Sequence, residues 1–307
     1  MTDASNFVNK NYEGIVKDII GDTFYVDTSY RGKIAKLRQF AEIVVRKLLD
    51  IDPSEQVTIG NKNILKKIKE LNNGDYIQKR LTIINKSGRE CTHTKITDKV
   101  TESEYVNVLD AVMDLLSVLL INYFDKYKFG SNKRVMSSFS ILPPIMRFKV
   151  LSFLYEKDPQ NIDVIDKLVL SILKSYGKDK AVAWVEERKD MLIATMTITE
   201  EAYCGIVSQY GEDVAKTIQK ASPANMYQLC MRKISEVGKV IESKGKLYDD
   251  FENALTFYRA NGILQGDGPE IIQFNDIMNF IYLGRKEAMQ KISDDSSGYI
   301  IMNFISE

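Results

Sequence analysis

Hydrophobic residues recur at three- and four-residue steps along most of the chain, which predicts a protein built from amphipathic helices. The clearest stripe occupies residues 31–50, and Pro53 blocks any continuation of that helix. Asn61 can cap a second helix that extends to Leu71. The apolar positions of a third helix follow, and this helix is predicted to end near Gly88.

A fourth, longer helix is predicted from residue 101 to about Tyr127. Thr101 and Glu104 have the spacing of a capping box, in which each side chain bonds the other residue's backbone N–H. Short connections and one long final helix indicate a four-helix bundle. The polar residues 85–100 are predicted to form a loop between its third and fourth helices, and residues 129–133 are predicted to be a domain boundary.

The second half repeats the helical pattern. Helices are predicted at residues 143–155, 161–177, around Ala181–Val185, and at 198–209, 223–237, 247–260 and 273–290. The secondary structure of two segments is not decided by the pattern. Phe24–Val26 fits a short strand or a loop, and residues 299–304 fit an edge strand or a packed tail. The predicted fold class is all-α, with one domain over residues 1–130 and a helical domain over 131–307.

Composition narrows the possible classes of protein. The 307 residues contain 44% hydrophobic residues and carry no formal net charge, which excludes wholesale disorder and a uniformly basic polyanion binder. Three cysteines form neither a disulfide framework nor a CxxC pair, and the first residues lack a signal pattern, so we expect a cytoplasmic protein. The longest apolar run, Val106–Phe124, contains Asp110 and Asp114, which indicates a core helix and no membrane partner.

The charge is nevertheless segregated along the chain. Residues 31–99 hold 16 Lys or Arg against 8 Asp or Glu. Such an excess can attract phosphates, although solvated helix faces are also often rich in lysine. The residues predicted to bind nucleic acid are Lys66, Lys67, Lys69, Arg80 and Lys95.

His93 is the only histidine and follows Arg89 closely. An imidazole can move a proton at a ribose hydroxyl while a guanidinium holds a phosphate, so the two can form a metal-independent RNA-cleaving pair. The alternative is a histidine that caps or hydrogen-bonds its loop. Cys91 and His93 supply only two potential metal ligands, and no nucleotide-binding glycine motif occurs, so we predict neither a metal site nor a cofactor.

Four segments over residues 25–128 resemble a family of HEPN-like helical domains found in prokaryotic restriction and antiphage-defence proteins. They are YRGKIAKLRQFAEIVVRKLLDI, NILKKIKELN, IINKSGRECTHTKIT and TESEYVNVLDAVMDLLSVLL. The resemblance implies a four-helix bundle, a homodimer and a role in a defence or regulatory complex. In catalytic members of the family, four to six residues lie between the Arg and the His, whereas three lie between Arg89 and His93.

Two functions therefore stay open. The shorter spacing favours a non-catalytic interaction or nucleic-acid-binding module of a defence complex, whose partner is RNA, DNA or a protein subunit. The single histidine in a basic segment favours an endoribonuclease in which His93 is the acid or base and Arg89 holds the phosphate, assisted by Arg80 and Lys95. We favour the binding module.

Overall fold

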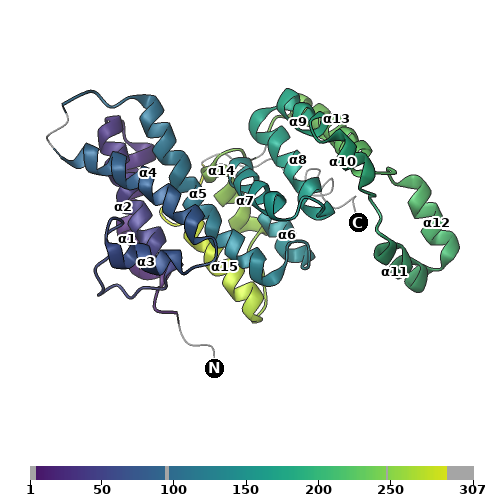
Figure 1. The fold of residues 1–307 in the computed structure, drawn as a ribbon, viewed down its shortest axis with the longest axis horizontal. Coiled ribbons are helices and arrows are strands. Elements are labelled where there is room, and N and C mark those ends of the chain that lie inside the picture. The colour runs from purple at the N-terminus through teal and green to yellow at the C-terminus, as the bar shows by residue number, and fades with distance from the viewer. Residues whose placement is uncertain (1–4, 94–96, 247, 289–307) are drawn as a thin grey trace. The chain divides into compact units, whose positions relative to one another are not determined.

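The computed structural model describes residues 5–93, 97–246 and 248–288, and these residues contain helices and no strand. The all-α prediction is confirmed for this part of the chain. Contacts between Cα atoms group the residues into two compact units, the first formed by 5–128 with 258–288 and the second by 129–257 (Figure 1).

The first unit contains six α-helices. They are α1 (Glu13–Ile20), α2 (Tyr30–Leu48), α3 (Lys62–Lys69), α4 (Gly74–Thr92), α5 (Glu102–Tyr127) and α15 (Pro269–Ile281). Helices α2, α4 and α5 pack against one another through the apolar stripes that the sequence predicts. Asn61 caps α3, and Thr101 and Glu104 form the predicted capping box of α5.

Helix α5 is the central element of this unit. Every residue from 111 to 121 is buried, so this helix has no solvated face over three turns. Asp114 is tolerated there because its Oδ2 accepts a hydrogen bond from Arg80 Nε at 2.9 Å. None of the described helices is long and apolar enough to cross a lipid bilayer.

Residues 9–25 are helical rather than extended. A 3₁₀ turn (Asn9–Tyr12) precedes α1, and a π-turn (Gly21–Tyr25) continues it. The short strand considered for Phe24–Val26 is therefore wrong. Thr23 stabilises the wider turn, because its buried hydroxyl donates to the Ile19 carbonyl at 2.7 Å. The strand or tail considered for residues 299–304 lies outside the described residues.

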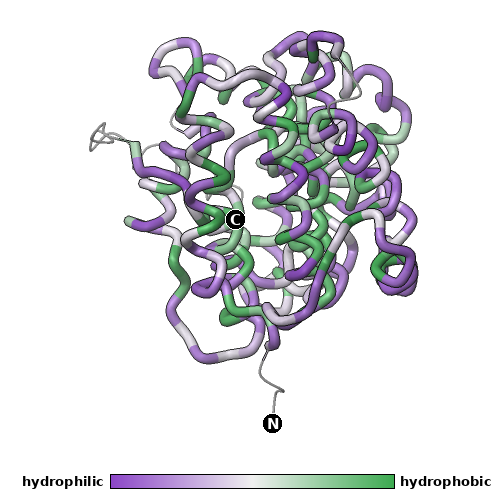
Figure 2. Tube along the Cα trace, turned by 90° about the vertical axis from the view of Figure 1, so that its left-hand side faces the viewer, coloured by the Kyte–Doolittle hydropathy of each residue, from purple (hydrophilic) through white to green (hydrophobic). Residues whose placement is uncertain are grey.

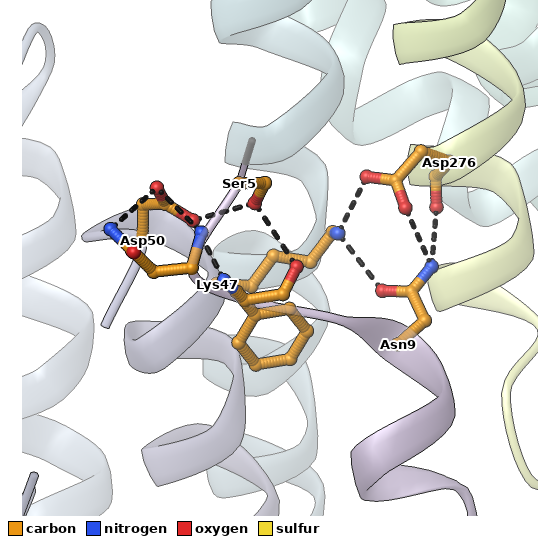
Figure 3. Close-up of polar contacts among 7 residues, drawn as sticks. Ser5, Asn9, Lys47, Asp50 and Asp276 are labelled. Carbon is orange, nitrogen blue, oxygen red and sulfur yellow. Dashed lines mark hydrogen bonds and ion pairs between the residues drawn. The ribbon is translucent and has the colours of Figure 1, made fainter. Parts of the chain in front are cut away.

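Lys47 joins three segments of the first unit that are distant in sequence (Figure 3). Its ammonium donates to Asp276 Oδ2 at 2.7 Å and to Asn9 Oδ1 at 2.9 Å, and the Asn9 amide donates to Asp276 Oδ1 at 2.9 Å. The Lys47 side chain is only 7% exposed and lies over the rings of Phe7 and Phe280. Lys47 therefore serves the packing of α2 on α15 and is not available at the surface.

The second unit consists of shorter helices. They are α6 (Lys133–Phe139), α7 (Pro144–Lys157), α8 (Ile162–Tyr176), α9 (Lys178–Glu186), α10 (Lys189–Ala194), α11 (Glu200–Tyr210), α12 (Glu212–Ala221), α13 (Met226–Lys244) and the start of α14 (Phe251–Asn261). Helix α8 is the core of this unit and packs on α7, α9 and α13. Along the helices of both units, hydrophilic and hydrophobic positions alternate (Figure 2), as expected for amphipathic helices.

A helix is found at each position predicted for the second half, with α6, α10 and α12 in addition. The helix predicted at 273–290 is shorter at its end, because α15 begins at Pro269 and ends at Ile281. The division into domains 1–130 and 131–307 stays a prediction, but one element departs from it. Helix α15 packs on α5, with the Tyr123 hydroxyl hydrogen-bonded to Glu270 Oε1 at 3.2 Å and the Tyr123 and Phe274 rings 5.4 Å apart. A single boundary in the sequence cannot place α15 with the first unit, because the chain passes through the second unit before it returns to the first.

Candidate nucleic-acid interface

Helix α4 extends further than the sequence predicts. Residues 85–92 were expected in a loop, but they continue the helix to Thr92, past Gly88. Gly88 faces α2 so closely that a Cβ atom there would lie 2.3 Å from Arg38 Cδ. Glycine is therefore required by the close packing of α2 on α4, and it does not mark the end of the helix.

This extension places Arg89 and His93 one helical turn apart. Arg89 lies in the last turn of α4, and His93 is the residue that caps it, with its N–H donated to the Arg89 carbonyl at 3.1 Å. Both residues are exposed. Arg31 holds this end of α4 from the side, donating to the carbonyls of Glu90 at 3.3 Å and Asp98 at 2.9 Å.

Arg89 and His93 also complete a longer stripe on α4. Lys79, Thr82, Lys86, Arg89 and His93 follow one another at steps of three, four, three and four residues, and all five are exposed. Residues with this spacing lie on one face of a helix. The face carries three permanent positive charges and the only histidine over about 21 Å of helix. We call these five residues the α4 face.

Helix α3 presents a second basic face beside it. Ile64 and Ile68 are buried beneath the helix, while Lys62, Lys66 and Lys69 are exposed on the outside at steps of four and three residues. We call these three residues the α3 face. Helix α3 packs against α4.

The three α3 lysines predicted to bind nucleic acid are thus all exposed. Lys66 and Lys69 lie on the α3 face, and Lys67 beside it has a long ion pair with Glu55, at 3.9 Å, between two exposed side chains. Such an exposed pair contributes little and leaves Lys67 accessible.

Arg80 is not part of either face. Its Nε donates to Asp114, and its guanidinium lies 3.6 Å from the centre of the Tyr76 ring. Burial and the nearby Asp114 carboxylate raise the pKa of Tyr76, which stays a neutral phenol. Arg80 therefore stabilises the α4–α5 contact, and Lys95 lies outside the described residues.

Many other cations of residues 31–99 are also engaged within the protein. Lys36 pairs with Asp22 at 2.7 Å and Arg38 with Glu42 at 3.4 Å, and Arg46 donates to two loop carbonyls. The cations of the α3 and α4 faces, in contrast, have no carboxylate partner among the described residues. The positive charge that the sequence distributes over this region is therefore available mainly on these two helices.

The sequence interpretation missed Lys62, Lys79 and Lys86. Assigning residues 85–100 to a loop hid the common face of Lys79, Lys86 and Arg89. The signal was present in the polar spacing of residues 79, 82, 86, 89 and 93, which is helical over its full length.

The chemistry of the site is that of charge and hydrogen bonding. In the described residues, no group of three or more His, Cys, Asp or Glu side chains converges as a metal site would require. Burial raises the pKa of the Cys91 thiol, which opposes formation of a reactive thiolate.

We compared the chain with protein-family models, with curated proteins and with solved structures. None of the three comparisons found a match.

Proposed function

We propose that the protein is a non-catalytic nucleic-acid-binding module whose α3 and α4 faces contact the phosphate backbone of RNA or DNA. The observation that carries the proposal is the accumulation of exposed Lys and Arg side chains on two neighbouring helices without carboxylate partners among the described residues. Phosphate contacts of this type release counterions and supply affinity independently of sequence.

The composition of the two faces favours nucleic acid over a protein partner. Protein interfaces gain most of their affinity from buried aromatic or aliphatic side chains at their centre. Large exposed hydrophobic side chains occur elsewhere in the described part of the first unit, such as Val8, Ile15 and Val106, but none lies on α3 or α4. Lysine, which dominates both faces, is depleted at protein interfaces and suited to phosphates.

Binding of an unstructured single-stranded RNA to the full chain tests this function. We expect fluorescence anisotropy of the labelled RNA to rise on titration with protein at about 50 mM salt, and single-stranded DNA to bind comparably because the contacts are to phosphates. The absence of binding to either strand under these conditions would contradict the proposal.

A second function, metal-independent RNA cleavage, is favoured by one specific observation. Arg89 and His93 share an exposed helical face one turn apart, where a guanidinium can hold a phosphate near an imidazole. The binding-module account expects no RNA cleavage in the presence of EDTA. If cleavage occurs, His93→Ala should reduce its rate by about 10²–10⁴-fold, because no second imidazole exists, and Arg89→Ala should show a parallel loss.

Retained folding decides how the His93→Ala result is interpreted. His93 is exposed, and its described contact is made by its backbone N–H, so the variant should keep the thermal unfolding midpoint of the wild type. Cleavage that persists in the folded variant would exclude His93 as the acid or base. Equal RNA binding by wild type and variant, without cleavage, is the outcome that the module predicts.

The biological setting rests on the HEPN-like resemblance alone. On that ground we propose that the module acts in a prokaryotic defence or regulatory complex and pairs as a homodimer through its first unit. Sedimentation at tens of micromolar protein would show a dimer, and a strict monomer would contradict the proposed pairing.

A further inference from the structure

Helices α11 and α12 form a hairpin that projects from the rest of the second unit. Their main packing contact is with each other, and Figure 1 shows them side by side beyond α10. At the base of the hairpin, the Met226 N–H donates to the Thr195 carbonyl at 2.8 Å. Met196 and Asn225 form an antiparallel bridge beside this bond. The hairpin is therefore a defined projection whose two ends are held together.

Very little of this hairpin is buried. All residues from 199 to 222 are described, and Ala215 is the only buried one among them. Helices of 10 or 11 residues are marginally stable by themselves, because few hydrogen bonds offset the cost of nucleation. In proteins, such helices gain most of their stability from the packing of an amphipathic face. We therefore expect the hairpin to be stabilised by a surface that covers its apolar side.

The exposed apolar side of α12 forms a narrow stripe. Val214, Ile218 and Ala221 follow one another at steps of four and three residues, which places them on one face of the helix. All three are exposed, and the exposed fractions of Val214 and Ile218 are 43% and 37%. This is the spacing of the apolar positions at which two helices of a coiled coil meet. We call these three residues the α12 seam.

Two opposite charges accompany the α12 seam. Asp213 and Lys220 are seven residues apart, so both lie on the same side of the helix, one near each end. Glu212 and Lys216 pair with each other at 2.7 Å within the helix. The part of the chain that the structure describes offers no such partner to the side chains of Asp213 and Lys220. One acid and one base are thus available beside the seam.

We propose that two copies of the chain pair through the α12 seam, with their α12 helices antiparallel around a two-fold axis. A two-fold contact uses the same surface on both copies, so that surface must be complementary to itself. Antiparallel pairing buries Val214 and Ile218 of both copies against one another. It also places Asp213 of each copy opposite Lys220 of the other, whereas parallel pairing would place like charges opposite one another.

This self-complementarity favours a second copy over a different protein as the partner. A different partner would not require the acid and the base to lie at equivalent places near the two ends of the seam. The contact is separate from the α3 and α4 faces and from the pairing proposed for the first unit. Because the surface of one short helix is small, we expect a dissociation constant of about 1–100 μM.

Sedimentation of the full chain at about 5 to 100 μM tests the pairing. Wild type should associate in this range, and Ile218→Glu should weaken association at least about tenfold, because each dimer would bury two unpaired carboxylates. Ile218 is exposed in the single chain, so the variant should fold. Ile272→Glu, at an exposed position on α15, is the matched control and should associate like wild type.

The same experiment separates this contact from pairing through the first unit. Two different two-fold contacts would continue from copy to copy, so wild type would form assemblies larger than a dimer and Ile218→Glu would reduce them to dimers. Wild-type dimers with Ile218→Glu monomers indicate pairing through α12 alone. Dimers in both proteins, or equal weakening by Ile272→Glu, would overturn the proposal. A strict wild-type monomer would also overturn it, and the seam would then belong to another segment or another protein.

Exchange of the two charges tests the antiparallel arrangement. Asp213→Lys places a lysine opposite Lys220, and Lys220→Asp places an aspartate opposite Asp213. Each variant alone should therefore associate at least about threefold more weakly than wild type. Mixed together, the two variants should pair with about the wild-type affinity, because opposite charges then face each other at both ends of the contact. A mixture that associates no more tightly than either variant alone would overturn the proposal.

Discussion

Replacing Lys66, Lys67 and Lys69 together by Glu is expected to weaken binding of single-stranded RNA by about 30- to 100-fold at about 50 mM salt. All three side chains are exposed on or beside the α3 face, so each lysine can contact a phosphate and each glutamate repels one. The loss should be alike for all RNA sequences, since phosphate contacts carry no base information. Fluorescence anisotropy with two unrelated sequences measures both effects.

Two controls separate charge from folding. The three lysines lie in the last turn of α3, where glutamate is unfavourable to the helix dipole, so Lys66→Gln, Lys67→Gln and Lys69→Gln in one chain provide a milder variant. Glutamate at Lys178, Lys180 and Lys239, exposed on α9 and α13 of the second unit, gives the same change in net charge elsewhere. Equal weakening by this second set would show that net charge alone governs binding and would contradict the assignment to α3.

Lys174→Met is expected to stabilise the second unit by about 2 kcal/mol at about pH 6. In wild type, burial and the charges of Arg147 and Lys167 lower the pKa of Lys174 from 10.5 to about 7 in the folded protein. Below about pH 7 the lysine is charged in both states, and the folded state bears the full penalty. As pH rises from about 7 towards 10.5, the folded state releases the proton that the unfolded state retains, so the free energy of unfolding increases.

Urea unfolding followed by Trp184 fluorescence at about pH 6 and about pH 9 measures this difference. Wild type should gain stability relative to Lys174→Met between the two values, because only wild type has the titrating ammonium. Lys178→Met, at an exposed position, should keep the wild-type pH dependence. Parallel pH profiles for wild type and Lys174→Met would show that the ammonium at this position is fully solvated.

Local patterns in the sequence predict most of the helices and several of their ends. The apolar stripe of α2, the Asn61 cap of α3 and the Thr101–Glu104 capping box of α5 each depend on residues within a few positions of one another. Likewise, Asp114 within the apolar run indicated a core helix, and its partner Arg80 explains how the carboxylate is accommodated. The sequence alone did not pair these two residues.

The remaining features depend on contacts between residues that are distant in the sequence. Gly88 reads locally as a helix end, but the approach of Arg38 from α2 makes it an interior position, and with it the α4 face becomes continuous. Arg80 is a second example. In the sequence it is one more basic residue after the α3 lysines, and only its contact with Asp114 on α5 shows that it belongs to the packing of the bundle. Arg147 and Lys174 lie on different helices, and only the packing of α7 on α8 brings their charges close together.

The salt dependence of RNA binding, compared between wild type and the chain with Gln at residues 66, 67 and 69, tests the proposed interface most directly. For wild type, the logarithm of the association constant should fall linearly with the logarithm of the KCl concentration, with a slope of about −0.7 for each phosphate contacted. The Gln chain should bind with a slope about 2 units shallower, because three phosphate contacts are removed. Identical slopes for the two proteins, or binding by wild type that does not respond to salt, would contradict phosphate recognition by α3.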